Sequence, residues 1–391
     1  MPRRPVIVGI GESDGPVAPH LSDEGHHAQA TVRALADAGL TRGDIDGYGT
    51  PSVTSVSMGA IRMAEYLGLR PAWLDSTNIG GASYELLVQH AARAIEAGDV
   101  ETVLLTYGEA SRSGGRAIGT RQRGGALEAR GHDQWTHPFG NTLIGSYALA
   151  ACRHMAQYGT TPEQLAAIAV TTRAHAARNP AAMYREPITV ADVLASPMIA
   201  DPLHLLDCCV ISDGGGAVIL TTEERARDLP ARPVDIAGAA SAVTHVNIAW
   251  MPDLTTTAAA VSGPRAFAQA GVQPKDVDLA MLYDSFTITA LLQFEDLGFC
   301  AKGEGPEFVR SHTFTNEGSF PTNTSGGQLS VGQAGAAAGF LGLTEAMRQV
   351  TGAPLGSAVP GARIALVSGF GMINYDRGLC CGAAILAGGG A

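Results

Sequence analysis

A phenol that directly follows a strand-like apolar run is the side chain best placed to do chemistry in this chain. It belongs to Tyr283, in the stretch Met281-Leu-Tyr-Asp-Ser-Phe-Thr. A free phenol has a pKa near ~10, so Tyr283 needs hydrogen-bond donors or a helix N-terminus nearby to act as a base at neutral pH. Two glycine-rich turns, Asn78-Ile-Gly-Gly-Ala-Ser and Asn323-Thr-Ser-Gly-Gly-Gln, lead into alanine-rich helical patterns. We therefore expect an active site built on helix N-termini.

The neighbouring candidates each have a structural interpretation as well as a chemical one. We expect helices to begin at Ala82 and Ala334 and to supply a positive field to the site. Ser83 could be a displaced nucleophile, but serine is favoured at helix starts and the sequence places no base beside it, which favours a capping role. Tyr283 could instead be a strand-end tyrosine packed between domains. Asp284 is expected to brace its own turn.

Composition excludes several classes of function. The 391 residues carry a net charge of −11, which argues against a nucleic-acid partner because such partners require a basic face. One locally basic run fits either a solvated arm or a set of anchors for the phosphates of an anionic cofactor such as coenzyme A. It comprises Arg112, Arg116, Arg121, Arg123 and Arg130.

No secretory signal or membrane-spanning segment is evident, so the sequence favours a cytoplasmic protein. The six cysteines include two vicinal pairs and lack the spacing of zinc ligands, so we interpret them as small buried hydrophobic residues and expect no metal site. They are Cys152, Cys208, Cys209, Cys300, Cys380 and Cys381.

Strand-length apolar runs alternate with amphipathic helical patterns, which is typical of an α/β fold with mostly parallel strands. The alternation occurs twice, which indicates an internal duplication. The expected units are an N-terminal half at 1–109 and 203–230, a loop or cap insertion at 110–202, and a C-terminal half at 231–391. In the first half we expect strands at Val6–Gly9, Ile45–Tyr48, Ala72–Ser76, Thr102–Tyr107 and Ala217–Leu220, and helices at Glu24–Ala38, Val56–Leu67 and Ser83–Ala97.

These residues resemble the thiolase superfamily, in particular its lipid-transfer-protein-like (sterol carrier protein thiolase-like) branch, over almost the whole chain. The matching motifs are Gly-Gly-Ala-Ser at 80–83, Tyr-Asp-Ser-Phe at 283–286, Asn-Thr-Ser-Gly-Gly at 323–327 and Ser-Gly-Phe-Gly at 368–371. The resemblance implies an α/β thiolase fold: two duplicated βαβαβαββ halves in an α-β-α-β-α layered arrangement, with a loop or cap insertion.

The chain departs from the family at all four usual catalytic positions. The position of the acyl-accepting cysteine corresponds to Gly81, and that of the activating histidine to Gln333. The late cysteine or histidine falls near Ser368, and the Asn-Glu-Ala-Phe or His-Asp-Cys-Phe segment begins here with Tyr283. Claisen thiolysis needs a covalent acyl carrier and its base, so ordinary thiolase activity is not expected.

Retro-aldol cleavage of a β-hydroxyacyl-CoA needs no covalent intermediate, only a base near the β-hydroxyl and donors that stabilise an enolate. The chain resembles steroid side-chain-cleaving aldolases of this branch in its tyrosine, which implies Tyr283 as the acid/base. Gln333 can hydrogen-bond a carbonyl but cannot exchange a proton. Ser368 and Ser83 are the further catalytic candidates. The expected substrate-binding residues are Gly81, Ala82, His137, Asn323, Gly326, Gly327 and Gly371.

The resemblance also implies partners. Coenzyme A is expected as part of the substrate and no cofactor as tightly bound. A homodimer is expected, paired through the strand at Ser76-Thr77-Asn78, with a zinc-ribbon/OB-fold companion protein. The alternatives are a thiolase-like acyltransferase of the acetyl-CoA acetyltransferase type and a non-catalytic subunit that binds CoA or lipid in a heteromeric complex.

Overall fold

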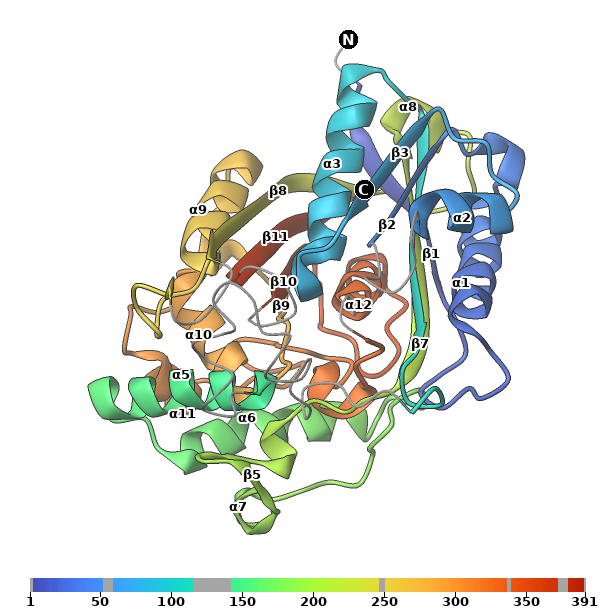
Figure 1. Cartoon of the computed structure of the whole chain (residues 1–391). Coiled ribbons are helices and arrows are strands. Elements are labelled where there is room, and N and C mark those ends of the chain that lie inside the picture. The colour runs from blue at the N-terminus through green and yellow to red at the C-terminus, as the bar shows by residue number, and fades with distance from the viewer. Residues whose placement is uncertain are drawn as a thin grey trace.

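The fold is described from a computed structural model of the chain (Figure 1). The structure describes residues 3–51, 59–115, 142–245, 250–335, 339–371 and 379–389, without the side chains of residues 379 and 380. The expected contributions of His137 and of Arg116, Arg121, Arg123 and Arg130 lie outside these residues, as does the side chain of Cys380. No helix within the described ranges is both long and apolar enough to cross a membrane.

One nine-stranded mixed sheet runs through the described part of the molecule, in the order β3-β2-β4-β7-β1-β8-β11-β10-β9. Its N-terminal part consists of β1 (Pro5–Glu12), β2 (Gly47–Pro51), β3 (Trp73–Thr77), β4 (Thr102–Ala110) and β7 (Asp213–Thr222). Its C-terminal part consists of β8 (Val234–His245), β9 (Leu279–Met281), β10 (Ile364–Gly371) and β11 (Leu379–Gly388).

The two parts of the sheet repeat one strand order, which confirms the duplication. In chain order, the first part is arranged third-second-fourth-fifth-first. The second part follows the same order, because an isolated parallel bridge from Ala280 in β9 to Thr322 stands where a third strand would lie. The first strands of the two parts, β1 and β8, meet antiparallel through Val6 and Ile7.

The expectation of mostly parallel pairing is wrong. Five of the eight strand pairs in the described sheet are antiparallel, and only β2 with β3, β2 with β4, and β9 with β10 are parallel. A parallel connection needs a dozen or more residues. Only residues 372–378 separate β10 from β11, so those two strands can pair only as antiparallel neighbours.

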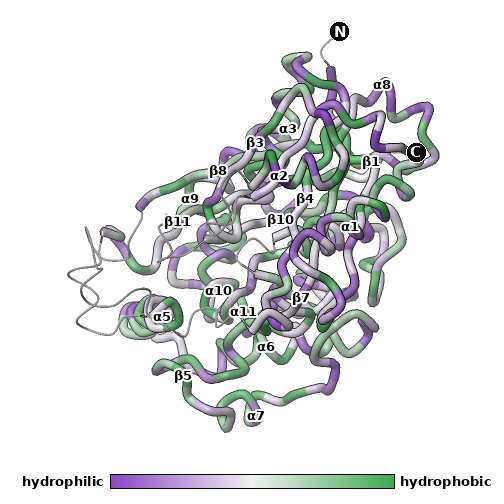
Figure 2. The backbone as a smooth tube through the Cα atoms, turned by 45° about the vertical axis from the view of Figure 1, so that its right-hand side comes forward, coloured by the Kyte–Doolittle hydropathy of each residue, from purple (hydrophilic) through white to green (hydrophobic). Residues whose placement is uncertain are grey.

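Helices cover both faces of the sheet and fill the space between its two parts (Figure 1). The helices α3 (Ser83–Ala97) and α12 (Phe340–Thr351) share a buried core with strands of both halves. The outer faces carry α1 (Asp23–Ala38) and α2 (Gly59–Tyr66) on one side, and α9 (Ala259–Ala270) and α10 (Thr287–Asp296) on the other. In Figure 2 the tube of α1 alternates between hydrophilic and hydrophobic residues, as expected of a helix lying on one face of a sheet.

The insertion between β4 and β7 forms a separate layer beside the C-terminal half. It contains α5 (Leu143–Tyr158), α6 (Pro162–Ala176) and α7 (Val190–Ala195), followed by the short strands β5 (Met198–Ala200) and β6 (Leu203–His204). The helices α5 and α6 pack into the same core as α10 and α11 (Gly305–Ser311). A short helix, α8 (Glu223–Ala226), follows β7. The boundaries of the three expected units remain a prediction.

Candidate active site

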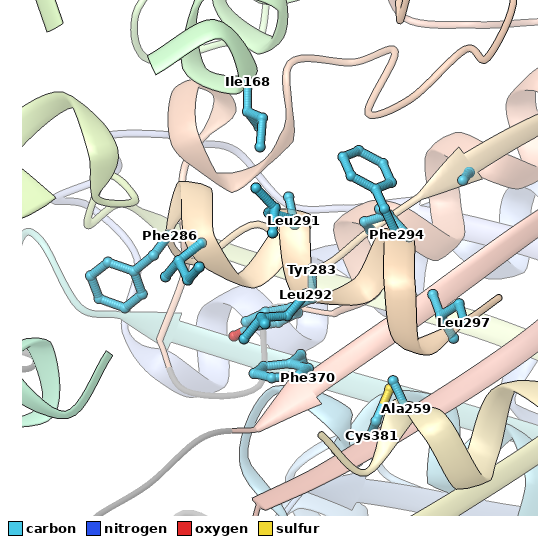
Figure 3. Packing of buried hydrophobic residues seen from close by; sticks show 14 of the residues in the cluster. Ile168, Ala259, Tyr283, Phe286, Leu291, Leu292, Phe294, Leu297, Phe370 and Cys381 are labelled. Atoms are coloured by element: carbon cyan, nitrogen blue, oxygen red, sulfur yellow. The ribbon is translucent and has the colours of Figure 1, made fainter. Parts of the chain in front are cut away.

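Tyr283 lies just beyond the end of β9, between that strand and the start of α10. Its side chain is only 4% exposed. Its backbone carbonyl accepts hydrogen bonds from Gln293 Nε2 at 3.0 Å and from Thr289 Oγ1 at 3.2 Å, both on α10. Figure 3 shows the phenol ring between α10 and the ring of Phe370 at the end of β10. The helix thus holds Tyr283 by its backbone and leaves the phenol directed away from it.

The ring of Tyr283 fills the space beside Gly81 into which a side chain would project. A Cβ atom built on Gly81 would overlap Tyr283 Cζ and the carbonyl oxygen of Phe370. Gly81 belongs to a 3-10 turn, Gly80–Ala82, that leads directly into α3 at Ser83, and all three residues of the turn are buried. The phenol therefore occupies the position that the family resemblance assigns to a nucleophile, at the N-terminus of a fifteen-residue helix.

Gln333 contacts the phenol directly. Its Nε2 lies 3.0 Å from Tyr283 Oη, and its Oε1 is buried with no hydrogen-bond partner among the described residues. A half-turn of the amide would let the phenol donate to Oε1, since the two ends of an amide differ only in donor and acceptor character. The pair can therefore accommodate the phenol as either donor or acceptor.

The helix expected to begin at Ala334 is absent from that position. Gln333 is extended instead, because its backbone pairs with the segment around Ile211: its N–H donates to Val210 at 2.6 Å and its carbonyl accepts from Ser212 at 3.1 Å. Gly335 has a positive φ of 75°, and α12 begins at Phe340. Because Gln333 lies in an extended segment rather than in a helix, its side chain can reach the phenol of Tyr283.

Ser368 is connected to Tyr283 through a bridging residue, Gln293, that the sequence analysis missed. Its hydroxyl donates to Gln293 Oε1 at 2.5 Å, and the Nε2 of the same glutamine donates to the Tyr283 carbonyl. Gln293 is fully buried on α10, and the only signal in the sequence was an amide within an otherwise apolar helical stretch. Ser368 therefore braces the backbone of Tyr283 through Gln293.

The turn at 323–327 holds the Tyr283 segment from the opposite side. Asn323 has a positive φ of 49°, and its Oδ1 accepts from the backbone N–H of Leu282 at 2.7 Å. Asp284 accepts from the backbone N–H of Gln328 at 2.7 Å, and burial raises the pKa of this carboxyl to about 7. A Cβ atom on Gly327 would overlap that carboxyl. Asp284 thus braces the Gly327 turn across the site in addition to the hydrogen bond that its carboxyl accepts from its own backbone.

The other residues predicted for the site pack or form hydrogen bonds around the Gly80–Ala82 turn and the surrounding segments. Ser83 is fully buried, with its hydroxyl donating to the Gly80 carbonyl at 2.7 Å and accepting from Ile79 N–H at 2.9 Å, which is the geometry of a local cap. Ala82 is buried in the turn beside Gly81, and Gly371 ends β10 one residue after Phe370. Arg112 Nη1 donates to the carbonyl of Ile211 at 3.3 Å. Gly326 packs tightly against Ala176 of α6, where a Cβ atom would meet that helix at 2.5 Å.

A small hollow of about 20 Å³ adjoins the phenol and is lined by Tyr283, Ser368, Gly339 and Gly342, among others. Ser325, Val331 and Leu341 line both this hollow and a larger cavity of about 250 Å³. The larger cavity has four carboxylates and no Lys or Arg among its described lining residues, and two of these carboxylates are paired, Glu12 with Arg348 at 2.8 Å and Asp14 with Arg33 at 2.6 Å. The four carboxylates belong to Glu12, Asp14, Asp213 and Glu345.

Within the described ranges, no cluster of three or more His, Cys, Asp or Glu side chains could hold a metal ion.

Comparisons with known proteins identify the family of the chain. Residues 240–380 match the family described as Thiolase C-terminal domain-like. A steroid side-chain-cleaving aldolase from Thermomonospora curvata is 36% identical over 95% of this chain and 96% of its own length. A 17-hydroxy-3-oxo-4-pregnene-20-carboxyl-CoA lyase from Mycobacterium tuberculosis is 36% identical over 94% of this chain and 96% of its own. Among solved structures, the Ltp2-ChsH2(DUF35) aldolase has a TM-score of 0.86 and 34% sequence identity, covering 98% of each chain. The chain belongs to the thiolase superfamily, in the sterol carrier protein thiolase-like branch that includes steroid side-chain-cleaving aldolases.

Proposed function

We propose that the protein cleaves the carbon–carbon bond beside a CoA thioester by a retro-aldol reaction on a β-hydroxyacyl-CoA, without a covalent acyl-enzyme. The observation that carries this proposal is the phenol of Tyr283, which fills the nucleophile's place at Gly81 and contacts Gln333. The aldolase and lyase relatives at 36% identity support it.

In the proposed reaction, Tyr283 acts as a phenolate and accepts the proton of the β-hydroxyl group. The bond between Cα and Cβ then breaks, and Cβ becomes the carbonyl carbon of the released aldehyde or ketone. The bonding electrons pass to Cα and the thioester as an enolate, and Cα then takes the proton from the Tyr283 phenol, which gives a shorter acyl-CoA and restores the phenolate. The N-terminus of α3, which begins at Ser83, provides a positive field for both the phenolate and the enolate.

A mass-spectrometric assay tests the reaction. The protein is incubated with β-hydroxyacyl-CoA esters that differ in their acyl group, including one with a tertiary hydroxyl on a steroid ring. We expect a carbonyl product and a shortened acyl-CoA in equal amounts, and an unchanged intact mass of the protein. A stable acyl adduct on the protein would instead support the acyltransferase alternative.

We further propose that the protein works with a companion chain and as a homodimer. The solved aldolase similar to this chain is named as a complex with ChsH2(DUF35), which supports a zinc-ribbon/OB-fold companion here. In the described sheet β3 is an outermost strand, and such an edge can pair with a second copy. Light scattering of the purified chain tests the dimer. Activity with and without a co-expressed companion tests the complex, and full activity of the isolated chain would contradict the need for one.

A further inference from the structure

Behind the Gly80–Ala82 turn lies a buried carboxyl that the proposed reaction does not yet use. Glu85, one helical turn beyond Gly81 on α3, is 2% exposed, and both of its carboxyl oxygens lack a hydrogen-bond partner in any other described residue. Glycines make room for it: a Cβ atom on Gly369 would overlap Oε2, and one on Gly339 would lie 2.8 Å from Oε1. That same Cβ position on Gly339 lies 2.8 Å from the Gly81 carbonyl oxygen, so the carboxyl sits directly behind the turn.

The surroundings of Glu85 cannot support a negative charge. On its own helix the titratable neighbour is Tyr84, and on β11 it is Cys381, whose side chain lies beside Ala259 of α9 (Figure 3). From β10 and from the segment before α12 it meets Gly369 and Gly339, and Tyr283 lies on the far side of Gly81. Among the described residues no cation and no other side chain pairs with this carboxyl, and a hydrogen bond from its own backbone N–H only partly offsets the cost of burying a negative charge. Burial accordingly raises the pKa of Glu85 to about 8.

We propose that Glu85 is a positioning residue of the site, whose carboxyl must stay uncharged so that the N-terminus of α3 can stabilise negative charge on the substrate. This inference rests on the proposed function. An ionised glutamate in the first turn of a helix is normally stabilised by the helix field. Here that field is needed at Gly81 for the developing enolate, about one helical pitch of ~5.4 Å away. A second negative charge at that distance opposes the first in a site with little water to screen it.

Glu85→Gln isolates the charge, because the amide has the same shape and is neutral at every pH. We expect kcat/KM for a cleaved β-hydroxyacyl-CoA to stay within about threefold of wild type at pH 7. Above pH 8 the wild type should lose roughly tenfold in rate for each pH unit, whereas the variant should retain its rate over at least the first of those units. Glu96→Gln, on an exposed position of the same helix, should follow the wild-type profile. An identical alkaline limb in Glu85→Gln and wild type would overturn the proposal.

A binding measurement separates this inference from the proposed reaction. S-carboxymethyl-CoA carries a carboxylate beside the sulfur, and S-ethyl-CoA serves as its neutral counterpart. We expect the affinity of the wild type for S-carboxymethyl-CoA to fall by roughly tenfold between pH 7 and pH 9, and that of Glu85→Gln to stay constant, with S-ethyl-CoA insensitive in both. This result can hold even if no β-hydroxyacyl-CoA is cleaved, in which case only the proposed reaction fails. An equal pH dependence of the affinity for S-carboxymethyl-CoA in both proteins would contradict the proposed role of Glu85.

Discussion

The phenol of Tyr283 occupies the space that a side chain at position 81 would fill, so a tyrosine at 283 requires a glycine at 81. Tyr283→Phe removes the proposed acid/base while keeping the ring that fills the space. We expect kcat/KM to fall by roughly 10²-fold or more, which is typical of losing a general acid/base, while binding of a CoA ester persists. Steady-state kinetics and calorimetric titration measure the two effects.

Tyr66→Phe is the matched control, since Tyr66 ends α2 and is 58% exposed. It should behave as wild type. Unchanged turnover by Tyr283→Phe in the presence of the companion chain would remove the phenol from the chemistry and favour a non-catalytic subunit.

Gly81→Ala tests the same contact from the other side. The added methyl group would overlap the Tyr283 ring and the Phe370 carbonyl, so either the phenol or the end of β10 must move. Overpacking of this kind costs about 1–3 kcal/mol, and we expect a lowered midpoint of urea unfolding together with a strong loss of activity. Gly43→Ala is the control in another 3-10 turn, where the nearest atom would lie at an ordinary 3.6 Å. Its stability should stay close to that of the wild type.

Motifs in the sequence predict Tyr283, Gln333 and Ser368 as site residues, and hydrogen bonds link these residues in the structure, while their part in catalysis stays a prediction. Sequence reasoning could not identify Gln293 or Glu85. Both are polar side chains whose importance comes from burial and from neighbours more than forty residues away in sequence, such as Ser368 and Gly369. Burial of that kind follows only once the two halves are packed together.

For the helices and strands, local sequence patterns predicted the limits of single elements well but predicted the direction in which strands pair poorly. The limits Ser83–Ala97 of α3 were predicted as they stand, because glycine turns flank the helix and Gly98 has the positive φ of 83° that ends it. The direction of the last strand in each half was wrong, since alternation of strand and helix does not reveal a strand that returns without a crossover helix. The extended segment at Gln333 was mistaken for a helix, because its pairing with Ile211 is a long-range contact.

A buried charge cluster joins the cap to α10 through the ion pair of His154 with Glu295. Glu295 accepts from Gly305 N–H at 2.9 Å and pairs with His154 of α5 at 3.0 Å, while Lys302 lies 3.1 Å from Glu295 and 2.5 Å from Asp296. Lys302→Met would leave both carboxylates without their cation. We expect a loss of about 3 kcal/mol in unfolding free energy, toward the low end for breaking a buried pair because the Lys302 side chain is 27% exposed. Urea unfolding measures this loss.

Lys275→Met is the control for Lys302→Met, because Lys275 is exposed in a short 3-10 turn. It should change stability little. Equal stability of the two variants would mean that the ion pairs of Lys302 with Glu295 and Asp296 contribute nothing to the stability of the fold.

Over the whole molecule, titration of buried groups couples stability to pH in opposing directions. Burial lowers the pKa of His26, His175 and His245, so the unfolded chain binds more protons than the folded one and stability rises with pH toward about 6.5. Burial raises the pKa of Glu85 to about 8 and that of Glu345 to about 7, which has the opposite effect over the range above their ordinary values. The wild-type profile alone therefore mixes several groups.

Comparison of wild type with Glu85→Gln isolates one group from this mixture. Between the ordinary pKa of 4.5 and the folded value of about 8, the unfolded chain has Glu85 ionised while the folded chain keeps it protonated. The folded state then binds the extra proton, so wild-type stability falls relative to the variant by up to roughly 1.4 kcal/mol for each pH unit. Below pH 4 and above pH 9 the difference should be constant. Urea unfolding of both proteins at pH 5.5, 6.5 and 7.5 measures it, and a difference that does not change with pH would show that Glu85 is ionised in the folded protein.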